Sequence, residues 1–135
     1  MKYDIVSLIT SILDSAGLST MLDTPLRHHS TISLTMKADI PAIHLTQEND
    51  GVWIWATVME SLPHSLHYCS ADLLPLMMTY EEEYFIAGQP CLYSVHNRLE
   101  LRAQVKEQYL HSPDTFLSLL DKYLIVLQDY RAVLI

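Results

Sequence analysis

The stretch that most constrains the fold is residues 52–58, which read Val52-Trp53-Ile54-Trp55-Ala56-Thr57-Val58. It is dense in β-branched and aromatic side chains, which fit a pleated strand. Asn49, Asp50 and Gly51 precede it, and these residue types tolerate the positive φ of a tight turn. Residues 52–58 are therefore predicted to be the closing strand of a hairpin. Because side chains alternate along a strand, Trp53 and Trp55 share one face and the aliphatic residues share the other.

Two earlier runs show the same alternation. Residues 31–36 alternate polar and apolar side chains, and residues 43–46 do so after Pro41, which is typical of strands with one wet face. If the three strands pair in order, one face is aliphatic and consists of Ile32, Leu34, Met36, Ile43, Leu45, Val52, Ile54 and Val58. The opposite face then carries Thr31, Ser33, Thr35, His44, Thr46, Trp53 and Trp55.

Two tryptophans on the small, polar face are the anomaly of this pattern. One interpretation is that a helix or a second subunit covers Trp53 and Trp55, as buried aromatic rings usually are covered. The other is that this face stays open for a partner, since exposed apolar patches mark interaction sites. The sequence leaves both interpretations open.

Three helices are predicted around these strands. Residues 5–16 carry one apolar stripe, with Asp4 as N-cap and Gly17 as the stop. Residues 66–78 are predicted to form a second helix, either kinked at Pro75 or replaced there by a new helix. The last helix begins at an N-cap, Ser112, followed by Pro113 and Asp114. Its apolar residues keep helical spacing to the C-terminus: Phe116, Leu119, Leu120, Tyr123, Leu124, Leu127, Tyr130 and Leu134.

A second hairpin is predicted between the second and third helices. Gly88-Gln89-Pro90 is predicted to be a turn, and strands 91–95 and 99–105 to meet around His96-Asn97-Arg98. The order is then α-β-β-β-α-β-β-α, with helices packed against a mainly antiparallel sheet, an α+β fold. At 135 residues the chain is expected to be a single domain, residues 1–135.

Charge and cysteine content narrow the function. A net charge of −8 and a pI near 5.1 argue against nucleic-acid binding, which needs clustered Lys and Arg. Cys69 and Cys91 fit no disulfide framework and are predicted to be free thiols in a reducing compartment. No signal peptide or membrane span is visible, so the expected location is the cytoplasm, without membrane insertion.

Catalytic patterns are weak. His28-His29 and His64-x-x-His67, with nearby Cys69, are the nearest approach to a metal site, because His at i and i+3 share a helix face. No second cluster stands at ligand spacing, and three glycines leave no nucleotide-binding loop. We therefore expect a non-enzymatic protein with no cofactor and no metal. A small hydrolase or metal-binding enzyme using His64 and His67 is the competing hypothesis.

Several local strings, in this order and spacing, resemble the class IB type III secretion chaperones of the InvB and SpaK kind. They are His29-Ser30-Thr31-Ile32, Ile40-Pro41-Ala42-Ile43, Val52-Trp53-Ile54-Trp55-Ala56 and Leu99-Glu100-Leu101-Arg102-Ala103. The resemblance extends from the first helix to the last. Pro75 and residues 81–90 depart from it.

The resemblance implies a homodimeric, ATP-independent chaperone in the bacterial cytoplasm. Such a protein binds the extended N-terminal segment of one or several type III secreted effectors and keeps them soluble and ready for secretion. The secretion ATPase and its sorting platform are further candidate partners. By analogy, the expected effector-binding residues are Ile32, Leu34, Ile43, Trp53 and Trp55. The expected dimer interface consists of Leu73, Leu74, Met77, Leu92 and Tyr93.

Two alternatives stand beside these expectations. For each aliphatic effector-binding position, plain core packing is the simpler explanation. For the whole protein, the alternative is a dimeric protein-binding adaptor of the same fold without a role in secretion.

Overall fold

A computed structural model describes residues 5–15, 17, 31–37, 39–48, 51–60, 66–78 and 84–134. The described elements, in chain order, are α1 (Ile5–Ser15), β1 (Thr31–Leu34), β2 (Ile43–Glu48), β3 (Gly51–Met59), α2 (Leu66–Met77), β4 (Phe85–Val95), β5 (Arg98–Val105), the 3-10 helix η2 (Glu107–Leu110) and α3 (Pro113–Leu134). The predicted α+β order is confirmed, and η2 is the one described element that the sequence pattern did not indicate.

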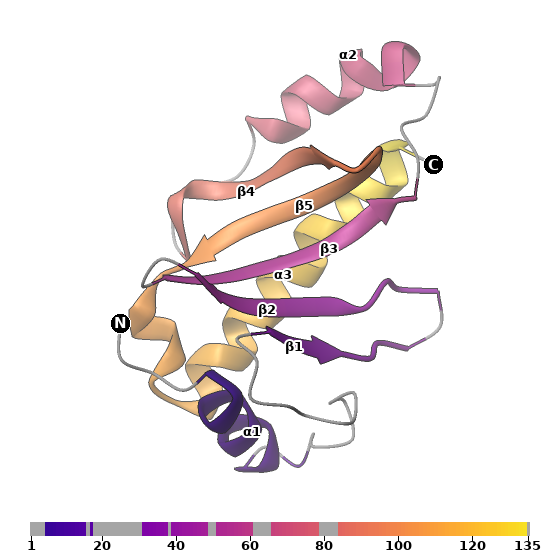
Figure 1. Cartoon of the computed structure of the whole chain (residues 1–135). Coiled ribbons are helices and arrows are strands. Elements are labelled where there is room, and N and C mark those ends of the chain that lie inside the picture. Colours follow the sequence, from indigo (N-terminus) through magenta and orange to yellow (C-terminus); the bar gives the residue numbers. More distant parts are fainter. Residues whose placement is uncertain are drawn as a thin grey trace.

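The strands form one antiparallel sheet in the order β1-β2-β3-β5-β4 (Figure 1). The first three strands pair as predicted, with Ile32 opposite Leu45 and Leu45 opposite Ile54. The second hairpin then adds β5, not β4, beside β3. The tryptophan-bearing strand β3 therefore lies in the centre of the sheet, and β1 and β4 form its edges.

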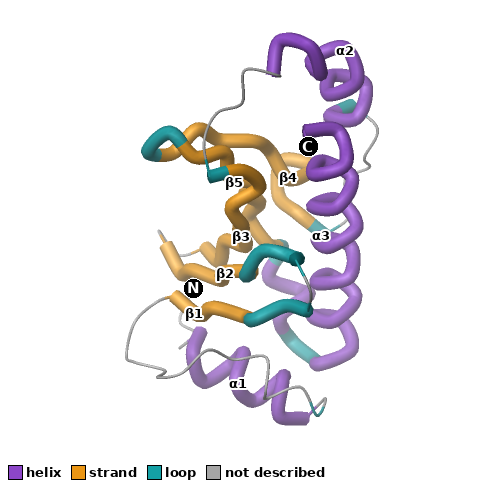
Figure 2. Tube along the Cα trace, turned by 90° about the vertical axis from the view of Figure 1, so that its right-hand side faces the viewer, coloured by secondary structure: helices purple, strands orange, loops and turns teal. Residues whose placement is uncertain are grey.

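The core lies between the aliphatic face of the sheet and two helices. In Figure 2, α3 runs along one side of the sheet, α1 lies beside β1, and α2 lies at the β4 end. The buried residues of α3 are Phe116, Leu119, Leu120, Tyr123, Val126, Leu127, Tyr130 and Leu134. Leu124, predicted to be part of this stripe, is only half-buried, and Val126 takes a buried place instead.

Tyr123 joins α3 to the centre of the sheet. Its ring is buried and its hydroxyl donates a hydrogen bond of 2.7 Å to the carbonyl oxygen of Leu101 in β5. Burial, and secondarily the charge of Glu100, raise the pKa of Tyr123 well above its usual value, while Arg102 lowers it. Tyr123 is therefore a neutral donor within the core.

Helix ends agree with the capping residues in the sequence. The hydroxyl oxygen of Ser112 accepts a hydrogen bond from the backbone N–H of Thr115, 3.3 Å away, which is the bond expected of an N-cap. Gly17 has a φ of +74°, and its N–H donates to the carbonyl oxygen of Asp14 at 3.1 Å. Gly17 thus ends α1 in the left-handed conformation, as predicted. Asp4, the predicted N-cap of α1, lies outside the described residues.

The structure decides the question at Pro75. No new helix begins there, because α2 continues through this residue to Met77. Proline removes the hydrogen bond from its own nitrogen to the preceding turn. Since only two residues of the helix follow Pro75, the loss falls in the last turn, where the N–H of Met78 donates to the carbonyl oxygen of Pro75 at 3.2 Å.

The turn predicted at Gly88-Gln89-Pro90 is wrong. These residues lie inside β4, which runs without interruption from Phe85 to Val95. The register between β4 and β5 shifts between Ile86 and Cys91, so the extra residues are absorbed as an irregularity in an edge strand. Edge strands accept proline and bulges because one side of their backbone needs no partner in the sheet.

The β4–β5 turn itself is tighter than predicted, since Arg98 already belongs to β5. Its two residues, His96 and Asn97, have φ values of 50° and 65°. Positive φ at both central positions favours Asn-Gly, and His is a poor residue for it. Changing His96 to Asn and Asn97 to Gly is therefore expected to raise the free energy of unfolding by about 0.5–1 kcal/mol, measurable by urea denaturation. The relief of left-handed backbone strain outweighs the freedom that glycine adds to the unfolded chain. Unchanged or lower stability would contradict the role assigned to these two angles.

Candidate protein-binding surface

The face of the sheet opposite α3 is the surface on which polar and aromatic residues gather. No helix or strand that the structure describes lies over this face (Figure 2). The side chains pointing to it alternate with buried ones along each strand, as in β3, where Val52, Ile54, Ala56 and Val58 are buried and Trp53, Trp55 and Thr57 are partly exposed. We call it the open face.

A row of contacting side chains crosses the open face at the level of Trp55. The hydroxyl oxygen of Ser33 and Nδ1 of His44 are 2.7 Å apart. The His44 ring packs on Trp55 with 4.2 Å between ring centroids, and the Arg102 guanidinium carbon lies 5.0 Å from the centroid of Trp55. The indole therefore has an imidazole and a cation beside it, a favourable arrangement for an electron-rich ring. These four residues are direct neighbours in the register of β1, β2, β3 and β5.

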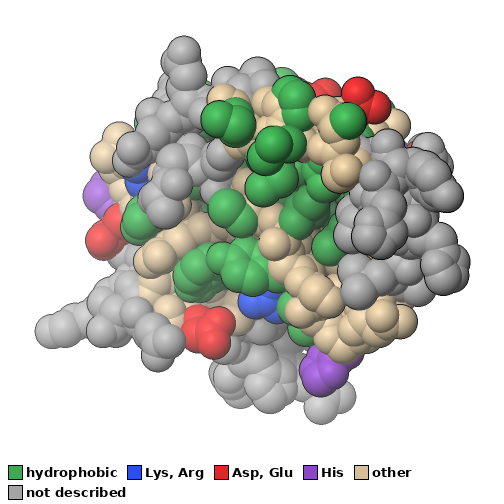
Figure 3. All heavy atoms as spheres, turned by 90° about the horizontal axis from the view of Figure 1, so that it is seen from above, with side chains coloured by type: hydrophobic (Ala, Val, Ile, Leu, Met, Phe, Trp, Pro, Cys, Tyr) green, Lys and Arg blue, Asp and Glu red, His purple; other side chains and the backbone are tan. Residues whose placement is uncertain are grey.

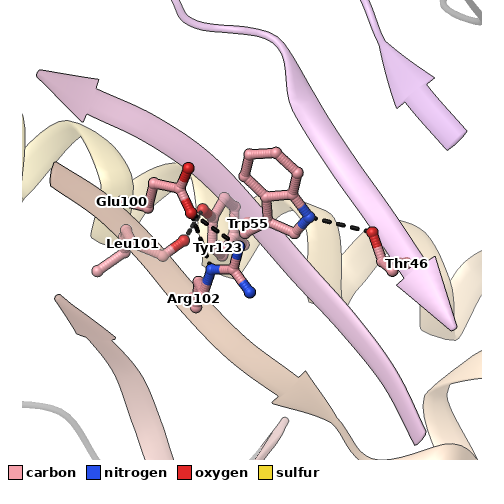
Figure 4. Close-up of polar contacts among 6 residues, drawn as sticks. All are labelled: Thr46, Trp55, Glu100, Leu101, Arg102 and Tyr123. Carbon is pink, nitrogen blue, oxygen red and sulfur yellow. Dashed lines mark hydrogen bonds and ion pairs between the residues drawn. The ribbon is translucent and has the colours of Figure 1, made fainter. Parts of the chain in front are cut away.

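Two further contacts fix the orientation of this row (Figure 4). Nε1 of Trp55 donates to Oγ1 of Thr46 at 3.1 Å. Arg102 binds Oε1 of Glu100 through both Nε at 2.9 Å and Nη2 at 2.8 Å. Glu100 is only 1 % exposed, and a carboxylate at that depth needs such a partner because burial without one is costly. Trp55 and Arg102 are thus held in place by contacts within the chain.

Two hollows flank the row. One, of about 440 Å³, is lined by Pro41, Ala42, His44, Thr57, Val58, Glu60 and Arg98. The other, of about 360 Å³, is lined by Glu48, Trp53, Tyr93, Val95 and Arg102. An open face that combines aromatic and apolar walls with fixed charges suits the binding of a protein segment.

Comparison with known proteins assigns the chain to a family. The model of the Invasion protein B family matches residues 17–96, which include β1 to β3, α2 and β4. The surface presentation of antigens protein SpaK of Salmonella typhimurium is 30 % identical over 121 residues, covering 89 % of this chain and 87 % of SpaK. SpaK of Salmonella typhi matches to the same extent. The chain belongs to the Invasion protein B family.

Membership of the Invasion protein B family confirms the resemblance to the InvB- and SpaK-like secretion chaperones that the sequence strings indicated. The match also covers residues 81–90, where the strings departed from the family pattern. Membership of this family associates the chain with type III secretion but does not identify what the chain binds.

Within this family member, the predicted effector-binding residues fall into two groups. Ile32, Leu34 and Ile43 point away from the open face and are buried in the core. They have no surface to offer a partner in this conformation, so core packing, the simpler explanation, describes them. Trp53 and Trp55 lie side by side along β3 on the open face and are partly exposed.

The residues predicted for the dimer interface lie on α2 and β4 but differ in exposure. Leu73 is buried, and Met77 and Leu92 are half-buried against the core. Leu74 is 59 % exposed and Tyr93 is 43 % exposed. The register places Tyr93 opposite Glu100, so Tyr93 also belongs to the open face and lines the same hollow as Trp53.

Arg102, Glu100 and His44 are parts of the surface that were not predicted as site residues. The signal for His44 was present, because the alternation of residues 43–46 already put it beside the tryptophans. Arg102 and Glu100 could not be placed because their position depends on β5 pairing with β3, which no local pattern reveals.

Two further findings concern membrane insertion and metal binding. None of the described helices is long and apolar enough to cross a membrane. Among the described side chains, no three His, Cys, Asp or Glu residues come together as a metal site. His28, His29 and His64, and the side chains of His67 and Cys69, lie outside the described part, so the histidine hypothesis is not tested there.

Proposed function

We propose that this protein is an ATP-independent chaperone of the bacterial cytoplasm that binds the extended N-terminal segment of one or several type III secreted effectors. The observation that carries the proposal is the position of Trp53 and Trp55 in a member of the Invasion protein B family. Both are partly exposed on a sheet face that none of the described helices covers. Soluble proteins rarely leave such rings at the surface unless a partner covers them.

The remaining features of the open face support a client that is unfolded when it binds. An extended segment brings backbone polar groups and alternate side chains to a surface, and here polar residues such as Thr46 and Thr57 stand between the aromatic ones. Backbone contacts depend little on sequence, so one chaperone can accept several effectors. A large contact area offsets the cost of ordering the segment.

The test is co-expression with the first hundred or so residues of a candidate effector, followed by size-exclusion chromatography with light scattering. The proposal expects a complex with two copies of this chain for each effector segment. If the chain forms a stable dimer that captures no exported protein, the adaptor alternative replaces the secretion role. Delivery to the secretion ATPase or its sorting platform would be tested next by pull-down with the loaded complex.

The proposal includes a homodimer built on α2 and β4, with Leu74, Met77 and Leu92 at its interface. Of the other two residues expected there, Leu73 is buried within the single chain and Tyr93 belongs to the open face, where the client binds. Viewed from the α2 end, hydrophobic side chains gather in one area of the surface (Figure 3). The exposed large ones are Leu74 on α2, Met78 directly after it, and Ile86 on β4. A patch of this kind at the edge of a sheet is suited to a second copy, because a two-fold axis brings the same patch of each copy together.

Replacing Leu74 and Met78 by Glu is expected to convert the dimer to a monomer without unfolding it. The two side chains are 59 % and 76 % exposed, so charges there cost the single chain little but would be buried without partners in the dimer. Light scattering measures the mass and a thermal melt the fold. The matched control is Ile125→Glu, at an equally exposed isoleucine on the outer side of α3. If the control alone gives monomers, the interface lies on α3.

A further inference from the structure

The smaller hollow of the open face is lined by residues of β2, β3, β5 and β4. Its lining residues are Glu48 from β2, Trp53 from β3, Arg102 from β5, and Tyr93 and Val95 from β4. Its volume is about 360 Å³, which is room for a few side chains and too little for a folded domain.

The register shows that this hollow runs diagonally across the strands. Glu48 is opposite Gly51, two residues before Trp53. Trp53 is opposite Gln104, two residues from Arg102, and Arg102 is opposite Cys91, two residues before Tyr93. Each step to the next strand thus advances two residues in the same direction, so the lining residues follow the diagonal that a twisted sheet makes concave. From Glu48 to Tyr93 this path is roughly 20–25 Å, the length of about seven extended residues.

One wall of this diagonal trough is fixed in advance. Thr46, Trp55 and Glu100 form the adjacent diagonal, and the bonds from Trp55 to Thr46 and from Arg102 to Glu100 hold it. Because these side chains are already ordered, a ligand does not have to order them, which preserves affinity for a flexible partner.

The chemistry of the trough changes along its length. The exposed carboxylate of Glu48 lies at one end, while Trp53, Tyr93 and Val95 supply apolar walls. Arg102 binds Glu100 through Nε and one N–H of Nη2. Other N–H donors of its guanidinium can bind a backbone carbonyl oxygen. An extended segment with apolar side chains in its middle and a basic residue at the Glu48 end satisfies all these groups. The net charge of −8 likewise favours a positively charged partner.

We propose that the trough lined by Glu48, Trp53, Arg102, Tyr93 and Val95 binds a short extended protein segment that crosses the strands on the sheet face, with apolar side chains over Trp53 and Tyr93 and a Lys or Arg beside Glu48. This inference deepens the proposed function, on which it rests, by stating where part of the client lies and which residue types select it. The client segment binds across the face of the sheet and does not add a strand to its edge.

The test uses synthetic peptides of about ten residues in a Ser/Thr host. The first carries two central leucines and a terminal lysine, the second has glutamate in place of lysine, and the third has serines in place of the leucines. The only tryptophans of the chain are Trp53 and Trp55, so their fluorescence reports directly on the trough. Trp55→Phe leaves Trp53 as the only tryptophan, so that selective tryptophan excitation follows this one side chain.

The lysine peptide is expected to change the emission of Trp53, and the serine peptide to bind at least tenfold more weakly. The glutamate peptide should bind about two- to fivefold more weakly than the lysine peptide, the range of an exposed charge pair. Glu48→Lys should reverse this preference, and Tyr93→Ser should weaken the leucine peptides. Glu48 and Tyr93 are exposed, so both variants can be expected to fold, which circular dichroism checks.

Unchanged emission with every peptide, or a preference that Glu48→Lys leaves as it is, would overturn the inference. So would emission that changes with protein concentration together with dimer formation, because a second copy would then occupy the trough. The proposed function fails separately, when co-expression captures no effector. A captured effector whose binding is unaffected by Glu48→Lys and Tyr93→Ser leaves the chaperone function standing and rejects the trough.

Discussion

Replacing Tyr123 by alanine is expected to lower the free energy of unfolding by about 3–5 kcal/mol, the usual cost of truncating a buried aromatic residue. Tyr123 is fully buried in α3, its ring lies edge-on to Phe85, and its hydroxyl bonds the carbonyl oxygen of Leu101 at the centre of the sheet. The loss therefore combines a cavity with an unmet hydrogen bond. Urea denaturation followed by circular dichroism measures it, and a cost below about 1 kcal/mol would mean that α3 does not pack as described.

The conservative variant Tyr123→Phe separates the two parts of this loss. It keeps the ring and removes the hydroxyl, so the expected cost is about 1–2 kcal/mol, the range of one buried hydrogen bond. It also has a pH signature. Because the folded chain raises the pKa of Tyr123 above the ordinary value of 10.0, folding keeps this proton bound more tightly than unfolding does.

The sign of the pH effect follows from that pKa shift. The stability tied to the Tyr123 proton is fully present below pH 10 and is lost as the pH rises above it. Tyr123→Phe should therefore lose less stability above pH 10 than the native chain. Tyr130, whose pKa is raised to about 12 by burial and then by Cys91, remains in both proteins and produces the same loss in each.

Local patterns were enough to predict most elements of this fold. Alternation located β1, β2 and β3 and their faces, because one buried face forces a period of two. The Ser112 cap located the start of α3. The errors came where a local signal was outweighed by the context. Gly88 and Pro90 are strong turn residues, yet an edge strand accommodates them, and Pro75 is tolerated because the helix ends two residues later.

The same local patterns predicted only part of the candidate site. The period of two put Trp53 and Trp55 opposite the core, and the structure agrees. It equally showed that Ile32, Leu34 and Ile43 share the core face of Ile54, so analogy with the family, rather than the pattern, suggested them as partner contacts. Arg102 and Tyr93 reach the tryptophans only through the order β3-β5-β4, in which the later strand inserts first. Pairing between strands so distant in sequence leaves no periodic trace in the chain.

The largest expected effect on function is that of Trp53→Ala on effector binding. Trp53 lines the trough, whereas the described contacts of Trp55 with His44, Thr46 and Arg102 give Trp55 a structural role as well. A central aromatic residue at an interface typically contributes 2 kcal/mol or more, so Trp53→Ala should weaken binding of a captured effector segment by about thirtyfold or more.

A binding titration and a thermal melt on the same variants decide how this effect is read. If Trp53 faces the partner, binding falls while the dimer and the fold persist, and Trp55→Ala lowers both binding and stability. If the rings are instead part of a covered core, each alanine variant would cost about 3–5 kcal/mol of stability, as Tyr123→Ala does. Ile125→Ala, which removes an exposed apolar side chain from the outer side of α3, should change neither quantity. A Trp53 variant that melts like Tyr123→Ala would move the client away from the open face.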